Sequence, residues 1–478
     1  MPDEGRPDGE GNPGQGGSTR RLGASSGRGR IRRTLRHPVT HNTLALYAVQ
    51  FGHYLLPLAV FPALARVLTD DSLGIVFFSQ AFATLVQTVV EFGFNLSGVR
   101  DIARAREHPS HLVRIMADVN GAKLVLAAIT LLASVAAAFV VPAFSGHLDY
   151  ALLAWVSGAS TGLNPRWVLV GLERVKASAT LELGCRALAV VLIVALVRHS
   201  DDVSLVLWIW ALTSVLPLVL VARMVSVIVP FGRSTAPGTR QAISSSWSLF
   251  VASAGIGLYT TANVFILGLL GPTAQIPLYS GPEKIIRAVG RLSFPLSTAV
   301  FPRVSHLAQG GKERRAERLA FISLVLLTAV GAASAIGLAI FAPLLVRLVL
   351  GPGYEEAESV LRAMAIMVPV IAATSALMGQ WLLAHGQDRS VRRIVLTVGV
   401  VNVAVACVVV PFAGAIGLAI SVVGAEVLAL VLTIATVRRR VPRPSDKSAS
   451  LPAEPVERAD PDDPAEPVER GAVGNPGA

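Results

Sequence analysis

The sequence predicts an all-α, multi-pass membrane protein with about twelve transmembrane helices, and three observations support this. Apolar segments of about 20 residues recur along the chain, and a helix of that length crosses the roughly 30 Å hydrocarbon core of a bilayer. Hydrophobic residues make up 53% of the chain and charged residues 15%, with a mean hydropathy of +0.59. Lys and Arg gather in every second loop, which is typical of membrane proteins. Because lipid offers no partner to backbone N–H and C=O groups, such segments must be helices.

The predicted spans follow one another with short polar joints between them. Flanking residues 1–40 are rich in Gly, Ser and Arg, which predicts a disordered basic cytoplasmic arm. Residues 441–478 are rich in Pro and Glu, which predicts a disordered cytoplasmic tail. The spans are predicted at 43–65, 73–95, 120–141, 150–171, 177–197, 204–228, 246–271, 284–304, 319–347, 360–384, 391–411 and 414–437.

The charged loops predict the orientation of these helices. Loops after odd-numbered spans are poor in Lys and Arg and often acidic, as at Asp70 and Asp201. Basic loops stay in the cytoplasm, so we expect a cytoplasmic-membrane protein with both termini in the cytoplasm. The net charge of +11 is then an orientation signal, and no nucleic-acid partner is expected. The basic loops after even-numbered spans contain Arg100, Arg104, Arg106, Arg114, Arg174, Lys176, Arg233, Arg240, Lys312, Arg314, Arg315, Arg318, Arg389, Arg392 and Arg393.

Sequence patterns of catalysis and metal binding are missing. Cys185 and Cys407 lie inside apolar segments without partner spacing, so neither a disulfide framework nor a metal site is expected. The sequence has no Gly-rich phosphate loop and no Ser/His/Asp constellation, and we expect no cofactor and no catalytic residue. The predicted outer loops are short, which disfavours a membrane glycosyl-transferring enzyme. Transport is favoured over catalysis.

Several short motifs occur in a characteristic order over almost the whole membrane region. In the first half they are Pro62-Ala63-Leu64-Ala65-Arg66, Glu91-Phe92-Gly93-Phe94, Gly98-Val99-Arg100-Asp101 and Asn164-Pro165-Arg166-Trp167. In the second half they are Tyr279-Ser280-Gly281-Pro282-Glu283-Lys284, Phe301-Pro302-Arg303, Gly351-Pro352-Gly353-Tyr354 and Gly379-Gln380-Trp381. With these motifs the chain resembles the polysaccharide flippases, the Wzx-like O-antigen and exopolysaccharide exporters of the multidrug/oligosaccharidyl-lipid/polysaccharide exporter superfamily.

The resemblance implies two six-helix lobes around a central cavity that opens alternately to the two sides. The lobes would be residues 41–230 and 246–440, joined by a cytoplasmic linker at 231–245. The implied cargo is an oligosaccharide on a polyprenyl diphosphate, a precursor of the cell envelope or an exopolysaccharide. Membrane lipids would be further partners, together with a polysaccharide polymerase or glycosyltransferases.

Charged residues within the spans are the candidate site residues, because each costs about 2.5–3.5 kcal/mol to insert. The eighth span carries Lys284, Arg287 and Arg291 at spacings of three and four, on one helical face. Arg presents a bidentate fork to phosphate oxygens, so this stripe is a candidate diphosphate site. The alternative is that Lys284 and Arg287 reach the outer headgroups and Arg291 pairs with a glutamate.

Three more arginines are candidates for the cavity. Glu182 and Arg186 lie four apart in the fifth span, where an intrahelical ion pair is the simpler interpretation. Arg166, next to Pro165, either lines the cavity or bonds carbonyls that the proline frees. Arg66 at the outer end of the first span is either a cation at the cavity mouth or a headgroup anchor.

Coupling to an ion gradient would need a carboxylate that changes charge within the membrane. Glu91, Glu182 and Glu426 are the candidates, since each lies in or near a span. The driving force stays open. Drug or cation antiport on the same fold is an alternative function, which would favour a carboxylate-dominated cavity. A peptidoglycan lipid-precursor flippase is a second alternative, although such proteins usually have more spans.

Overall fold

The computed structural model describes residues 59–291, 313–384 and 386–440, and within these ranges the chain is helical without any strand. Seven of the described helices are long and apolar enough to cross a membrane. The predicted all-α membrane architecture is therefore confirmed, while the total of about twelve helices stays a prediction. The predicted arm at 1–40, the tail at 441–478 and most of the first span lie outside the described residues.

The chain divides into two compact units. The first comprises Met1–Ala288 with Pro343–Ala357, and the second Val289–Ala342 with Glu358–Ala478. The six-plus-six division of the lobes stays a prediction. Helices with most of their residues in the first unit are α3 (Asp70–Glu91), α4 (Phe94–Arg104), α5 (Pro109–Val140), α6 (Leu148–Leu163), α7 (Arg166–Gly171), α8 (Val175–Leu196), α9 (Val203–Ile228), α10 (Ala236–Thr260), α11 (Ala262–Leu270), α12 (Gln275–Arg291) and α15 (Ala342–Val349), with the short 3-10 turn η1 (Pro142–Phe144).

The second unit contains the remaining described helices. α14 packs against α17, and α17 against α18. α18 contains a non-helical residue, Gly414, with φ of 50° and ψ of −133°. Since glycine adopts positive φ without a steric penalty, the chain turns here, at the predicted boundary between the eleventh and twelfth spans. The helices are α14 (Glu313–Ile340), α16 (Glu356–Ala365), α17 (Met367–Leu377), the π-helix η2 (Met378–Leu383) and α18 (Asp388–Arg440).

The predicted linker at 231–245 is helical from residue 236, where α10 begins. The Thr235 side chain accepts a hydrogen bond from the backbone N–H of Gly238, and Pro237 lies in the first turn. Both features favour helix initiation, because they satisfy or remove backbone donors that a helix start leaves unpaired. The seventh span therefore starts ten residues, nearly three helical turns, further back than the hydropathy pattern indicates, and it is divided by a break at Thr261.

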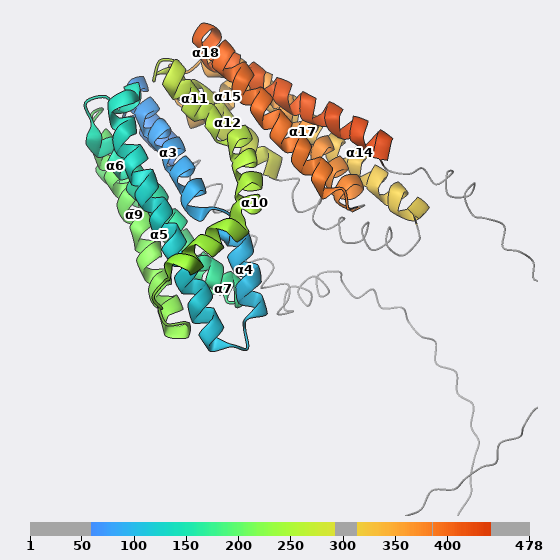
Figure 1. The fold of residues 1–478 in the computed structure, drawn as a ribbon. Helices are drawn as coiled ribbons and strands as arrows, with labels where there is room; N and C mark the ends of the chain where they lie inside the picture. Colours follow the sequence, from blue (N-terminus) through green and yellow to red (C-terminus); the bar gives the residue numbers. More distant parts are fainter. Residues whose placement is uncertain (1–58, 292–312, 385, 441–478) are drawn as a thin grey trace, which may run out of the picture. The chain divides into compact units, whose positions relative to one another are not determined.

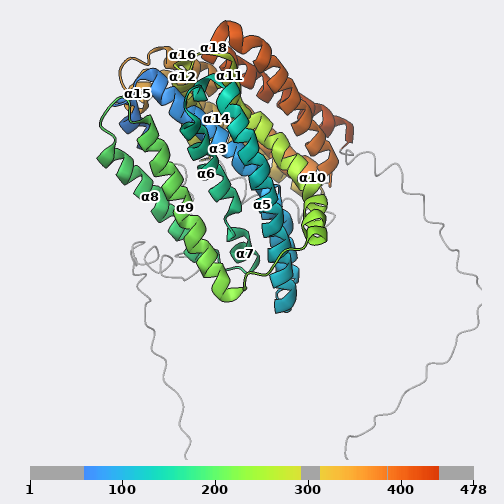
Figure 2. The same cartoon turned by 60° about the vertical axis from the view of Figure 1, so that its left-hand side comes forward.

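Helix α6 is central to the first unit and packs against α3, α5 and α9 (Figures 1 and 2). Two glycines of α6 make its contact with α3 close. A Cβ on Gly158 would lie 2.2 Å from the carbonyl oxygen of Ala83, and one on Gly162 would lie 2.7 Å from the Cβ of Val90. A Gly-x-x-x-Gly spacing allows this approach of two backbones in a membrane, where close van der Waals packing drives helix association.

Lys123 of α5 is a fully buried cation at the end of α6. The backbone N–H of Arg166 donates to the side chain of Asn164 at 3.0 Å instead of continuing the helix. The carbonyl of Gly162, four residues before Arg166, accepts from Lys123 Nζ at 2.7 Å. The ammonium group also lies 5.9 Å from the ring centroid of Trp167. Lys123 therefore closes the α6 end that the Asn164-Pro165 break leaves open.

Replacing Lys123 by alanine should destabilise the protein by roughly 2–5 kcal/mol, the usual range for removing a long buried side chain. The substitution leaves a void and a buried carbonyl without its donor. Thermal unfolding in detergent measures this loss. Lys176→Ala, at an exposed position near the start of α8, is the control and should change stability little. Equal stability of Lys123→Ala and the wild type would contradict this role.

Candidate functional site

A cavity of about 590 Å³ lies in the first unit. Its wall comes mainly from α3, α6, α8 and α9, and α12 adds one residue, Lys284. Neutral polar side chains dominate the lining that is not aliphatic. They are Ser79, Gln80, Thr84, Gln87, Asn95, Ser157, Thr161, Asn164, Thr213 and Ser214. A cavity inside a membrane-spanning unit that is lined in this way is suited to a polar, water-soluble group.

Helix α3 contributes a row of polar residues to the cavity lining. Gln80, Thr84, Gln87 and Glu91 follow one another at spacings of four, three and four, and all four line the cavity. This spacing places them on one helical face. The sequence analysis singled out only Glu91. The signal that would have found the others is the recurrence of polar residues at helical spacing within an otherwise apolar span.

Lys284 enters the cavity from α12 and contacts α3. Its Nζ donates to Oε1 of Gln80 at 2.8 Å. The same atom lies 4.4 Å from the ring centroid of Phe61 and 4.5 Å from that of Phe77. Two aromatic faces and one neutral acceptor hold the ammonium group without neutralising it. Among the described residues no carboxylate lies within ion-pair distance of this ammonium group, so it can meet an anionic ligand in the cavity.

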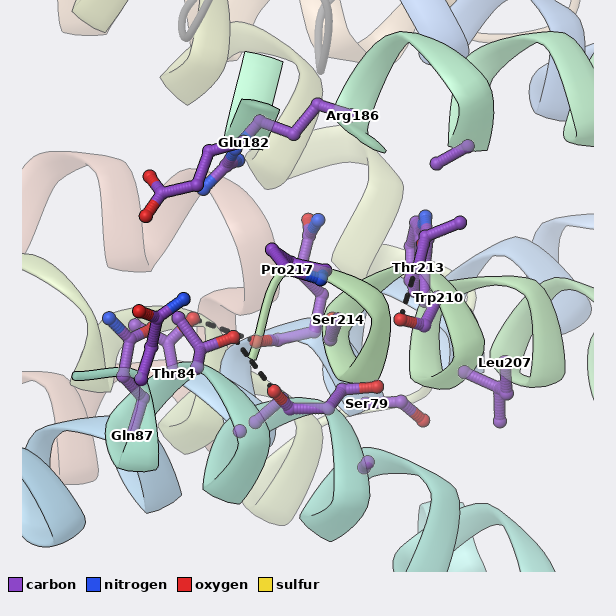
Figure 3. A pocket seen from close by; sticks show the side chains of 18 of the residues that line it. Ser79, Thr84, Gln87, Glu182, Arg186, Leu207, Trp210, Thr213, Ser214 and Pro217 are labelled. Atoms are coloured by element: carbon purple, nitrogen blue, oxygen red, sulfur yellow. Dashed lines mark hydrogen bonds between the residues drawn. The ribbon is translucent and has the colours of Figure 1, made fainter. Parts of the chain in front are cut away.

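The second group of cavity charges lies on α7 and α8. Nη1 of Arg166 donates to Oε2 of Glu182 at 2.8 Å. The simpler interpretation from the sequence, an ion pair of Glu182 with Arg186 on the same helix, is therefore wrong. Among the residues that the structure describes, Arg186 makes no ion pair within 4 Å, and it lines the cavity. Figure 3 shows Glu182 and Arg186 on one side of the cavity and Thr84 and Gln87 on the opposite side.

The predicted stripe of α12 is divided. Arg287 pairs with Glu283 at 2.7 Å, one turn earlier on the same helix, and it does not line the cavity. The ion pair with Glu283 holds the Arg287 guanidinium on its own helix, although its spacing from Lys284 allows both to share a face. The side chain of Arg291 lies outside the described residues. The predicted face therefore contributes Lys284 to the cavity and not Arg287.

The remaining candidates lie in different surroundings. Arg66 is exposed and donates to the carbonyl of Pro62 at 3.1 Å, away from the cavity lining. Glu91 lines the cavity and accepts from Nε2 of Gln87 at 2.9 Å. Glu426 is buried in α18 and belongs to the second unit. In the part of the chain that the structure describes, the cavity thus combines the cations Arg166, Arg186 and Lys284 with the carboxylates Glu91 and Glu182.

Comparison with known protein families identifies the family of this chain. Residues 39–308, more than half of the chain, match the family described as polysaccharide biosynthesis protein. The chain belongs to that family. A relative from Escherichia coli (strain K12), named as an O-antigen transporter, is 26% identical over 404 residues, which cover 83% of this chain and 96% of the relative. A relative from Shigella dysenteriae with the same name is 25% identical over 403 residues, 83% of this chain and 99% of its own.

Solved structures show that this family member has the fold of the superfamily that the motifs indicated. The inward closed conformation of the lipid II flippase MurJ superposes with a TM-score of 0.63 at 13% identity, covering 83% of this chain and 87% of the other. An inward-facing multidrug resistance MATE family transporter superposes with a TM-score of 0.62 at 16% identity, covering 83% and 96%. The protein is a Wzx-like member of the superfamily and a transporter rather than an enzyme.

Proposed function

We propose that this flippase moves an oligosaccharide linked to a polyprenyl diphosphate across the cytoplasmic membrane by alternating access. The observation that carries the proposal is the polar cavity, in which the three cations Arg166, Arg186 and Lys284 outnumber the two carboxylates Glu91 and Glu182. The curated relatives named as O-antigen transporters support it, because an O-antigen is a polysaccharide of the cell envelope. The direction would be from the inner to the outer leaflet, with both termini in the cytoplasm.

The positions of the cations suit a diphosphate that enters the membrane. Lys284 is nine residues from the start of α12, and Arg186 is eleven residues from the start of α8. At 1.5 Å per residue these positions are roughly 13 and 16 Å into their helices. Charges within a membrane-spanning segment are costly to insert unless they face water or a partner. A diphosphate offers that partner, since its oxygens accept charge-assisted hydrogen bonds from Arg and Lys.

The carboxylates of the cavity argue against drug or cation antiport as the main function. Arg166 neutralises Glu182 at 2.8 Å, which leaves Glu91 as the cavity carboxylate whose described hydrogen bond comes from a neutral group, Gln87. A cation binding here would meet the positive charges of Arg186 and Lys284. Transport of a peptidoglycan lipid precursor uses the same phosphate chemistry, so the glycan must be identified by experiment.

Deletion of the gene, followed by identification of the polyprenyl-linked glycans of the cytoplasmic leaflet, tests the proposal. We expect one oligosaccharide lipid to accumulate, and its accumulation to be reversed by the wild-type gene. A matched control is a gene for the variant Arg287→Gln, whose altered arginine lies outside the cavity lining and which should also reverse it. Accumulation of no glycan lipid, together with a changed tolerance to cationic drugs, would favour the antiporter. Accumulation of the peptidoglycan precursor would favour the second alternative.

A further inference from the structure

Four hydroxyl groups on the cavity wall donate their protons to backbone carbonyls of their own helices. Thr84 donates its hydroxyl proton to the carbonyl of Gln80 at 2.9 Å, and Thr213 donates to that of Ile209 at 2.7 Å. Ser157 and Thr161 each donate to the carbonyl four residues earlier, both at 2.9 Å. A hydroxyl has one proton and two lone pairs, so each of these oxygens can still accept but no longer donate.

The amide groups of Gln87 and Gln80 each have one end engaged by a charged neighbour. Nε2 of Gln87 donates to Oε1 of Glu91, and this leaves Oε1 of Gln87 as an acceptor. Lys284 can only donate, so it fixes Oε1 of Gln80 toward itself and leaves the NH₂ of Gln80 for other partners. The acceptor wall is defined as Thr84, Gln87, Ser157, Thr161 and Thr213, which all line the cavity. Its four hydroxyl groups can only accept further hydrogen bonds, and Gln87 adds an acceptor oxygen beside its second N–H.

A wall of acceptors next to cations selects a ligand with two different parts. The cations suit an anion, whereas the acceptor wall and Glu91 repel a second anion and bind O–H or N–H donors. Trp210 also lines the cavity and adds an aromatic side chain. Ser79 adds a buried hydroxyl without a hydrogen-bond partner among the described residues. A sugar with free hydroxyls next to a diphosphate has both parts.

We propose that the acceptor wall binds the hydroxyl groups of an uncharged sugar attached to the diphosphate, so that this cavity selects neutral sugars over uronic acids. This inference rests on the proposed function and adds the chemistry of the sugar to it. Sites that hydrogen-bond a substrate hydroxyl discriminate strongly against a substrate lacking it, because their own polar groups are then left unpaired. The inference therefore predicts specificity at the sugar and not only affinity for the phosphate.

Binding of three lipids to the full chain in nanodiscs tests the inference. The lipids share one polyprenyl diphosphate and carry no sugar, glucose or glucuronic acid. For the wild type we expect the glucosyl lipid to bind most tightly and the glucuronosyl lipid at least tenfold more weakly. In the variant with both Thr161→Val and Thr213→Val, affinity for the glucosyl lipid should fall about three- to tenfold per hydroxyl, with the sugar-free lipid unchanged.

Thr180→Val is the matched control, because Thr180 makes the same type of hydrogen bond to the carbonyl of Lys176 at 3.0 Å but is exposed and does not line the cavity. It should leave all three affinities unchanged. If the double variant does not fold, a series of deoxyglucosyl lipids on the wild type replaces it, with losses expected for each hydroxyl that the wall accepts.

The outcomes separate the inference from the proposed function. Equal losses for the glucosyl and sugar-free lipids, no loss at all, or preference for glucuronic acid would each overturn the sugar assignment while diphosphate binding stands. Failure of all three lipids to bind would overturn the proposed function and the inference with it.

Discussion

Replacement of Arg186 by glutamine is expected to lower the affinity for the lipid-linked glycan about 10- to 100-fold, with transport reduced in proportion. Arg186 lines the cavity without an ion pair among the described residues, so its charge is available to the diphosphate. Loss of a hydrogen bond to a charged group costs about 1.5–3 kcal/mol, which corresponds to the stated factor. Binding in nanodiscs and accumulation of the glycan lipid in cells measure the two effects.

Two control variants make this test specific. Arg186→Lys keeps the positive charge and should retain part of the affinity, although it loses the bidentate fork. Arg287→Gln removes a charge that Glu283 already pairs at 2.7 Å and that lies outside the cavity lining, so we expect near wild-type affinity. If Arg287→Gln impaired binding while Arg186→Gln did not, the α12 stripe would be the phosphate site and this assignment of the cavity would be wrong.

Replacement of Gly158 by alanine is expected to prevent the first unit from folding correctly. The new Cβ would lie 2.2 Å from the carbonyl oxygen of Ala83, a backbone atom that can move only if α3 and α6 separate. Overpacking of this kind typically costs about 1–3 kcal/mol and more where backbone must shift. We expect a sharp loss of monodisperse protein on size-exclusion chromatography and a lowered unfolding temperature.

Gly184→Ala is the matched control for that result. Gly184 lies within α8, and a Cβ there would meet nothing within 4 Å. Alanine is the better helix former by about 0.5–1 kcal/mol, so this variant should be as stable as the wild type or slightly more stable. Normal folding of Gly158→Ala would show that α3 and α6 are not held together by the close contact at Gly158.

The sequence was a good guide to features that depend on residues close together along the chain. Segment length and hydropathy predicted the helical membrane architecture, and the ordered motifs predicted the family. The break in α18 at Gly414 could also be placed, because Pro411 and Gly414 interrupt an apolar run locally. The start of α10 was missed, since Thr235 and Pro237 favour a helix in a stretch that is too polar for a span.

The site was predicted less well, because the partners of charged residues come from other helices. Spacing along one helix favoured a pair of Glu182 with Arg186, but the packing of α7 brings Arg166 to Glu182. The same helical spacing placed Lys284 and Arg287 on one face. In the structure, Arg287 pairs with Glu283, whereas Lys284 donates to Gln80 and lines the cavity.

The sequence by itself determined that this protein is a helical membrane transporter of its family, since the bilayer imposes the length and hydropathy of each span on the local sequence. Tertiary structure alone decided which polar side chains share a cavity and which charges are neutralised. The physical reason is that ion pairs and hydrogen bonds act over a few ångströms in space, and the approach of α3 to α6 at Gly158 and Gly162 sets those distances between residues far apart in the chain.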